Sequence, residues 1–380
     1  MRTTNDTKLE RNPYSSILSG PHQVSLDITN KCNLRCLHCY NSSGENALIN
    51  DELSDDEVIS FIEDVASLKP YGFCFCGGET LLRSDLIVKS LSILKNAEVS
   101  AALVSNGILL TDSILARFYN NGLRSIQFSM DGTRAAHDKM RGKSGAFDAV
   151  LNALRLALEY EDLRVSIAYC PTQFNIDTFE DLYSTVCDVY LKSKQHISKP
   201  DLTLELRVQP LMLLGRARLN KYIRPTEIQY RYLVNKIHYL QEYGSTNGTK
   251  IQWGDPIDHM LRYANATMIM DQMTVRSNGD LVVSPYIPLV VGNIRKHSFT
   301  DYWNAGLCDT WCSNIVSKFS SHMYSIDTME EVCEEISDVA MGGELRYDII
   351  DGCDLNNVEP LGQYSCLLEE RCIGAMYHQW

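Results

Sequence analysis

The sequence lacks long hydrophobic runs and lacks an excess of positive charge. No segment approaches eighteen consecutive apolar residues, so no transmembrane helix is expected. The first fourteen residues are polar and contain no apolar signal region, which predicts a cytoplasmic protein. Lys and Arg total 35 against 48 Asp and Glu, a net charge of −13 that disfavours nucleic-acid partners. With no internal repeat, the 380 residues predict a globular protein of two or three domains.

Cysteine, in contrast, is plentiful. The chain holds 13 cysteines, and it is too long to need a framework of disulfides. In a reducing compartment, clustered cysteines are metal ligands or catalytic groups more often than disulfides. The positions of the cysteines therefore carry most of the functional information.

Short apolar runs alternate with amphipathic helical patterns over the first half of the chain. This alternation predicts a parallel sheet that binds ligands at the carboxyl ends of its strands. After Arg216 the alternation lapses, and a long helix at about 225–243 precedes a hairpin around Asn278-Gly279. The predicted strands are 24–28, 71–76, 99–104, 125–130, 164–169 and 202–208.

Three cysteines follow the first strand with the spacing C-x3-C-x2-C: Cys32, Cys36 and Cys39. Thiolates hold iron–sulfur clusters, and a cubane cluster takes four ligands when the protein supplies them all. Three cysteines therefore leave one iron open, as a catalytic site requires. Two alternatives remain at this point, a zinc site with His38 as the fourth ligand, and unrelated buried thiols.

This triad resembles that of the radical S-adenosylmethionine (SAM) superfamily. The resemblance implies a 4Fe-4S cluster whose open iron is chelated by SAM, and reductive cleavage of SAM to a 5′-deoxyadenosyl radical that abstracts a substrate hydrogen atom. It places His38 near the adenine. The implied fold is α/β, a partial (βα)6 TIM-like barrel with a smaller irregular α+β C-terminal domain.

Further motifs along the barrel support the resemblance. Gly77-Gly78-Glu79 is similar to the family's GGE motif, which holds the methionyl amine of SAM. Ser129 and Arg141 lie in a run similar to S-x-D-G…H-D…R-G. By the resemblance, the serine contacts the ribose or carboxylate of SAM and the arginine pairs with the carboxylate.

Three other barrel segments receive weaker assignments. Ser105-Asn106-Gly107 resembles a family turn, and Gly215-Arg216 lies in a segment that closes the partial barrel. Asp131 is assigned to substrate contact or to a turn, with no preference between the two. Cys74 and Cys76 alternate toward one face of a strand and are expected to be packed thiols.

The C-terminal part resembles SPASM or twitch extensions, which hold auxiliary iron–sulfur clusters, but its cysteines depart from their pattern. The hairpin ends in Ser284 where the pattern has cysteine. Cys353, Cys366 and Cys372 are the candidate ligands of one auxiliary cluster. Packed thiols, one residual cluster and two clusters all stay open. Cys308 and Cys312 are expected to share a helix face.

The domain divisions expected from these patterns are an N-terminal extension at 1–22, a radical SAM barrel at 23–222, a helical linker at 223–270 and a SPASM/twitch-like domain at 271–380. Only about 22 residues precede the first strand, so a peptide substrate would be held by the C-terminal part or by a separate peptide-recognition protein.

The resemblance implies modification of a ribosomally made peptide, by crosslinking or epimerisation. A dehydrogenase or epimerase of a sugar or other small molecule is the alternative, and a non-catalytic metal-cluster scaffold or sensor is the remote one. An external electron donor such as flavodoxin or ferredoxin is expected. Candidates for quenching the product radical are Tyr286, Cys170 and Cys312.

Overall fold

A computed structural model describes residues 20–46, 49–194, 204–244, 249–254, 256–261, 272–339 and 344–352. Within these ranges, no helix has the length and apolar character needed to cross a membrane. Eleven described strands form one sheet in the order β11-β10-β9-β8-β1-β2-β3-β4-β5-β6-β7. The strands are β1 Gln23–Asp27, β2 Gly72–Cys76, β3 Ser100–Ser105, β4 Leu123–Ser129, β5 Arg164–Tyr169, β6 Leu204–Val208, β7 Thr249–Trp253, β8 Gln272–Val275, β9 Asp280–Ser284, β10 Ile287–Asn293 and β11 Leu345–Arg346.

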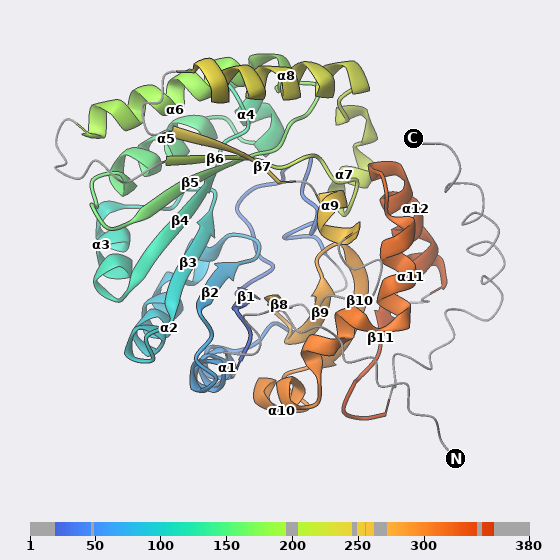
Figure 1. Ribbon diagram of the computed structural model, residues 1–380. Coiled ribbons are helices and arrows are strands. Elements are labelled where there is room, and N and C mark those ends of the chain that lie inside the picture. Colours follow the sequence, from blue (N-terminus) through green and yellow to red (C-terminus); the bar gives the residue numbers. More distant parts are fainter. Residues whose placement is uncertain are drawn as a thin grey trace.

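Strands β1 to β7 are parallel and curve into an open wall, with helices on its outer side (Figure 1). The helices of this half are α1 Asp55–Ser67, α2 Ser84–Asn96, α3 Asp112–Asn120, α4 Arg134–Arg141, α5 Ala146–Ala157, α6 Phe179–Lys194, α7 Arg216–Leu219 and α8 Glu227–Tyr243. Local sequence sets their starts: Ser54 and Glu57 form a capping box at α1, and Thr111 caps α3.

The two faces of the wall differ in polarity. Outward side chains such as Phe73 are buried, and the Phe73 ring lies 6.4 Å from that of Phe61 on α1. Inward side chains are polar or small, and most are half-buried. Asp27 on β1 lies directly across from Cys76 on β2, so both face the interior. The interior of the open barrel is therefore a polar space that a ligand can enter.

The C-terminal part continues the same sheet. β8 pairs in parallel with β1, and β9 and β10 follow as antiparallel neighbours. Helices α10 Phe299–Asn304, α11 Asn314–His322 and α12 Ile326–Val339 stand beside this hairpin, and α9 Pro256–Leu261 precedes it (Figure 1). Arg295, after β10, binds Glu57 at 2.6 Å and the Asp51 carbonyl at 2.9 Å, which ties the C-terminal part to the start of α1.

The predicted fold class is confirmed, with an addition. All six predicted strands and the hairpin are present, with bounds that differ by about two residues. β7, which follows α8, is a seventh parallel strand that the sequence did not predict. Only Ile251 of β7 is buried, and Lys250, Gln252 and Trp253 are exposed, so its pattern is too polar to resemble the others.

Candidate active site

The loop 30–46, which follows β1, carries the three cysteines of the C-x3-C-x2-C motif. All three are free thiols; Cys36 is buried, and Cys32 and Cys39 are half-buried. The Arg141 guanidinium donates to the Cys36 sulfur at 3.7 Å, and the Ser43 N–H donates to the Cys39 sulfur at 3.4 Å. Burial raises the pKa of the Cys36 thiol to about 11. A thiolate here therefore needs a cationic partner, as a metal cluster provides.

The donor set of this loop is three free thiols, Cys32, Cys36 and Cys39. A 4Fe-4S cluster attaches each cysteine to a different iron, and three cysteines leave one iron open. The three thiols therefore have the chemistry that such a cluster needs.

Arg216, which follows β6, holds the cysteine loop in place. Its side chain is largely buried and donates to the carbonyls of Cys36 and Ser43, both at 3.0 Å, and to Glu45 at 2.9 Å. The preceding Gly215 has a φ of +53°, and a Cβ there would lie 2.1 Å from the Tyr40 carbonyl oxygen. The segment predicted to close the barrel thus packs directly against the loop, a role of Arg216 that the sequence did not reveal.

The Gly77-Gly78-Glu79 turn packs against the beginning of the same loop. A Cβ at Gly78 would lie 2.1 Å from the Lys31 carbonyl oxygen, and the Gly78 N–H donates to the Thr29 carbonyl at 2.7 Å. The buried Glu79 carboxylate accepts from the Leu81 N–H, the Ser105 hydroxyl and the Asn106 N–H at 2.7 to 3.0 Å. Its described bonds therefore join the ends of β2 and β3, and its contact with the methionyl amine of SAM stays a prediction.

A buried charged group surrounds Asp131 at the end of β4. The Asp131 carboxylate lies 2.7 Å from Arg141 Nε and 3.5 Å from His38 Nε2. Burial would raise the pKa of Asp131, but the Arg141 charge, with the two histidines, lowers it overall. The backbone N–H of Asp131 donates to His137 Nδ1 at 3.0 Å. Burial lowers the pKa of both His38 and His137 to about 4, so both rings are neutral near pH 7.

Buried polar atoms near the loop lack partners. His38 Nδ1 and Asn33 Nδ2 are buried without a hydrogen-bond partner among the described residues. Asn33 Oδ1 accepts from the Asn106 amide at 2.7 Å, which links the loop to the end of β3. Ser129 lies at the end of β4 on the inward face, half-buried. Unsatisfied buried groups are costly, so these atoms fit a polar ligand such as SAM at the carboxyl ends of the strands.

Comparison with known proteins agrees with this geometry. Residues 26–186 match the profile of the Radical SAM superfamily. A stretch of 153 residues is 32% identical to Fe-coproporphyrin III synthase of Methanosarcina barkeri, covering 40% of this chain and 38% of that protein. A stretch of 165 residues is 30% identical to the sporulation killing factor maturation protein SkfB of Bacillus subtilis, covering 43% and 38%. Residues 26–186 are therefore identified as a radical SAM domain.

A likeness of fold extends beyond the matched residues. Streptococcus suis SuiB, solved with bound S-adenosylmethionine, superposes with a TM-score of 0.58 over 87% of this chain and 77% of that one, at 13% identity. This likeness concerns the fold. The chain spans about two fifths of the length of the two curated relatives.

The C-terminal cysteines lie far from the triad in sequence. Ser284 is buried and its hydroxyl accepts from the Tyr286 N–H at 3.1 Å, a local turn contact. Cys308 and Cys312 lie on a 3₁₀ turn, Leu307–Cys312, where residues four apart point about 120° from each other, so the expected shared face is wrong. Cys353, Cys366 and Cys372 lie outside the described residues, and their assignment stays a prediction.

The remaining cysteines and the candidate quenchers occupy distinct places. Cys74 and Cys76 face the interior, half-buried, with their sulfurs 3.5 Å apart. Cys170 follows β5 and its N–H donates to Asp131 at 3.1 Å. Tyr286 lines a cavity beside the C-terminal hairpin, whereas Cys312 belongs to the 3₁₀ turn. Their assignment as quenchers of the product radical stays a prediction.

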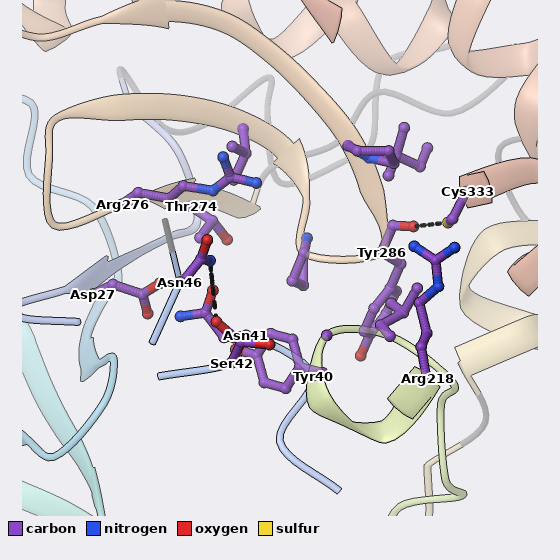
Figure 2. Close-up of a pocket in the computed structure, with 16 residues that line it drawn as sticks. Asp27, Tyr40, Asn41, Ser42, Asn46, Arg218, Thr274, Arg276, Tyr286 and Cys333 are labelled. Carbon is purple, nitrogen blue, oxygen red and sulfur yellow. Dashed lines mark hydrogen bonds between the residues drawn. The ribbon is translucent and has the colours of Figure 1, made fainter. Parts of the chain in front are cut away.

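A cavity of about 240 Å³ separates the cysteine loop from the C-terminal hairpin (Figure 2). Asp27, at the end of β1, and Tyr40, directly after Cys39, form one side. The other side comes from β8 to β10 and α12, with Arg276, Tyr286 and Cys333. Burial raises the pKa of Asp27 to about 6, against the Arg276 charge. Sequence reasoning missed Asp27 because it looked like the last residue of an ordinary strand.

Proposed function

We propose that this protein is a radical SAM enzyme that abstracts a hydrogen atom from a ribosomally made peptide and so modifies it, by crosslinking or epimerisation. The observation that carries the proposal is the triad, three free thiols held on one loop at the carboxyl end of β1. Cys32, Cys36 and Cys39 would hold a 4Fe-4S cluster. That cluster, when reduced by an external donor such as flavodoxin or ferredoxin, supplies the electron that cleaves SAM.

The chain's own residues have distinct parts in this proposal. Arg141 donates to Cys36 and neutralises Asp131, and its remaining guanidinium face suits the SAM carboxylate. His38, neutral and with a free Nδ1, suits the adenine. Gly77 and Gly78 let the backbone approach SAM closely, and the Glu79 carboxylate suits the methionyl amine. Ser129 offers a hydroxyl to the ribose or carboxylate.

Two comparisons support a peptide as the substrate. One curated relative is named as a maturation protein for sporulation killing factor. SuiB has also been solved bound to its precursor peptide SuiA, and that structure superposes with a TM-score of 0.55 at 13% identity, over 76% of this chain and 66% of that one. The cavity beside the cysteine loop opens from the barrel toward the C-terminal hairpin, where an extended substrate would lie.

A small-molecule substrate is the second candidate. It is favoured by the relative named Fe-coproporphyrin III synthase. The cavity of about 240 Å³ is smaller than the roughly 300–1,000 Å³ typical of pockets for drug-sized ligands, which argues for a single side chain rather than a large ring system. Incubation with deuterated peptide or deuterated small molecules separates the two, because deuterium in 5′-deoxyadenosine identifies the molecule that lost it.

The test of the activity is anaerobic reconstitution with iron and sulfide followed by addition of reductant and SAM. We expect 5′-deoxyadenosine and methionine to form, and the triple variant Cys32→Ala/Cys36→Ala/Cys39→Ala to form neither. Cys187→Ala, which removes a buried thiol of α6, is the matched control and should cleave SAM. Stoichiometric zinc without SAM cleavage would contradict the proposal and favour a non-catalytic scaffold. Residual iron of about four per chain in the triple variant would indicate one auxiliary cluster.

A further inference from the structure

Asp27 is a buried carboxylate that faces a cavity and has no bound partner. Its side chain is 7% exposed, and no hydrogen bond or ion pair reaches its carboxylate among the described residues. Its register partner Cys76 and the nearby Tyr40 and Tyr286 are neutral groups at pH 7. Buried carboxylates are normally paired, because burial of an unpaired charge costs several kcal/mol.

The two positive groups that line the cavity already have partners. Arg276 forms an ion pair with the Glu344 carboxylate. Arg218 forms an ion pair with Glu334 at 2.8 Å. Each arginine thus has its own carboxylate partner, and the Arg276 charge acts on Asp27 without forming an ion pair with it. Asp27 is the carboxylate among the described lining residues that lacks a hydrogen bond or ion pair. The electrostatics of the cavity therefore favour a cation.

The other walls of the cavity include apolar side chains that suit the methylene groups of a long side chain. Tyr40 lies on one side, still 42% exposed, and Tyr286 lies across the cavity (Figure 2). Leu214, Pro285 and Ile287 add apolar surface. Aromatic faces attract cations and pack against methylene groups. An acidic end with an aromatic and aliphatic wall matches an alkyl chain that ends in an ammonium or guanidinium group.

We propose that this cavity binds a substrate side chain with a cationic nitrogen, lysine-like in shape, and that Asp27 is its counter-ion. The proposal rests on the proposed function, because it takes a peptide as the source of the side chain. It names a specificity residue on β1, directly before the cysteine loop. The side chain held there lies beside Tyr40, the residue after Cys39, and so next to the proposed cluster.

The test measures binding to the reconstituted protein without reductant, by ligand-detected NMR. The probes are Nα-acetyl-lysine N-methylamide, its norleucine and glutamine counterparts, and n-butylammonium. We expect the lysine probe to bind about ten-fold or more tightly than norleucine or glutamine, because a charge-assisted hydrogen bond to a buried carboxylate is lost in both. Asp27→Asn should remove this preference. Glu205→Gln, which changes another inward carboxylate that does not line the cavity, should keep it.

Four outcomes overturn the inference or a part of it. Equal binding of lysine and norleucine by the wild-type protein does so without any variant, so a misfolded Asp27→Asn protein does not obscure the result. Lysine binding too weak to detect at about 10 mM does so as well. An unchanged preference in folded Asp27→Asn removes Asp27 from the proposal. If n-butylammonium binds as tightly as the lysine probe, the cavity does not require a peptide as the source of the cationic group. Because no outcome depends on SAM cleavage, failure here is distinct from failure of the proposed activity.

Discussion

Single side chains decide how the cysteine loop and the cavity beside it are built. Arg216 and Asp27 are both buried charged residues beside the loop, but the Arg216 side chain is hydrogen-bonded and, among the described residues, the Asp27 carboxylate is not. Arg216 is fully engaged by two carbonyls and Glu45, so it contributes to stability. Asp27 faces the cavity with an uncompensated charge, so it costs stability in the absence of a ligand.

The cost of Asp27 predicts a pH-dependent effect of its replacement. Because burial raises its pKa from 3.8 to about 6, the folded state binds the extra proton between these values. Its contribution to stability is fully present below about 3.8 and is lost as the pH rises through about 6. The difference between the two pKa values corresponds to about 3 kcal/mol, taken as an upper bound.

We therefore expect Asp27→Asn to be more stable than the wild type at pH 8, by up to about 3 kcal/mol, with the difference shrinking toward pH 4. Urea unfolding at several pH values under anaerobic conditions measures it. Asp85→Asn, which removes an exposed ion pair with Arg117, is the control and should change stability by about 1 kcal/mol or less. A difference that stays constant with pH, or that grows as the pH falls, would contradict the unpaired state of Asp27.

At the scale of elements, a comparison of two glycines, Gly72 on β2 and Gly78 in the turn after it, shows how the turn supports the cysteine loop. Gly78 needs the absence of a Cβ because the Lys31 carbonyl occupies that space, whereas Gly72, on β2 itself, has no atom closer than 3.8 Å. Gly78 therefore contacts the cysteine loop and Gly72 does not, although both belong to β2 or the turn that follows it.

Gly78→Ala is expected to lower the free energy of unfolding by about 1–3 kcal/mol through overpacking, and to lower the iron retained after reconstitution. Gly72→Ala should change stability by about 0.5 kcal/mol or less and keep its iron. Chemical denaturation and iron analysis of the two variants give the comparison. Equal iron content in both would show that the turn does not support the loop.

Local sequence patterns predicted most of the strands and helices of the barrel, but they could not predict contacts between residues far apart in the sequence. Strands β1 to β6 alternate buried and inward residues or end at clear turn signals, so their positions follow from the sequence. The pairing of β8 with β1 joins residues about 250 apart, and no period or cap encodes it. The motifs located the triad, the glycines and Arg141. The contacts of Arg216 and the cavity at Asp27 depend on which strands meet, and appeared only in the fold.

At the scale of the whole molecule, the continuous sheet joins the barrel and the C-terminal part. The β8–β1 pairing, the Phe61–Phe299 ring contact at 5.8 Å and the Arg295–Glu57 ion pair all connect the two. Such extensive contact favours cooperative unfolding over separate melting of two domains.

The corresponding prediction is that two probes of thermal unfolding give the same midpoint. Circular dichroism at 222 nm reports mainly on the barrel helices. In a Trp253→Phe/Trp380→Phe background, the remaining tryptophans Trp303 and Trp311 report by fluorescence on the C-terminal part. Arg295→Gln should lower both midpoints together. Two separated transitions would instead indicate that the C-terminal part unfolds independently.

The position of β8 in the sheet gives the C-terminal hairpin a role that is independent of the cysteine expected in place of Ser284. In the open barrel β1 would be an edge strand, and unpaired edges invite pairing with other chains and aggregation. β8 covers that edge along four residues, Gln23 to Leu26. By pairing with β1, the β8–β9 hairpin covers this edge through backbone contacts, and that task does not require a cysteine in place of Ser284.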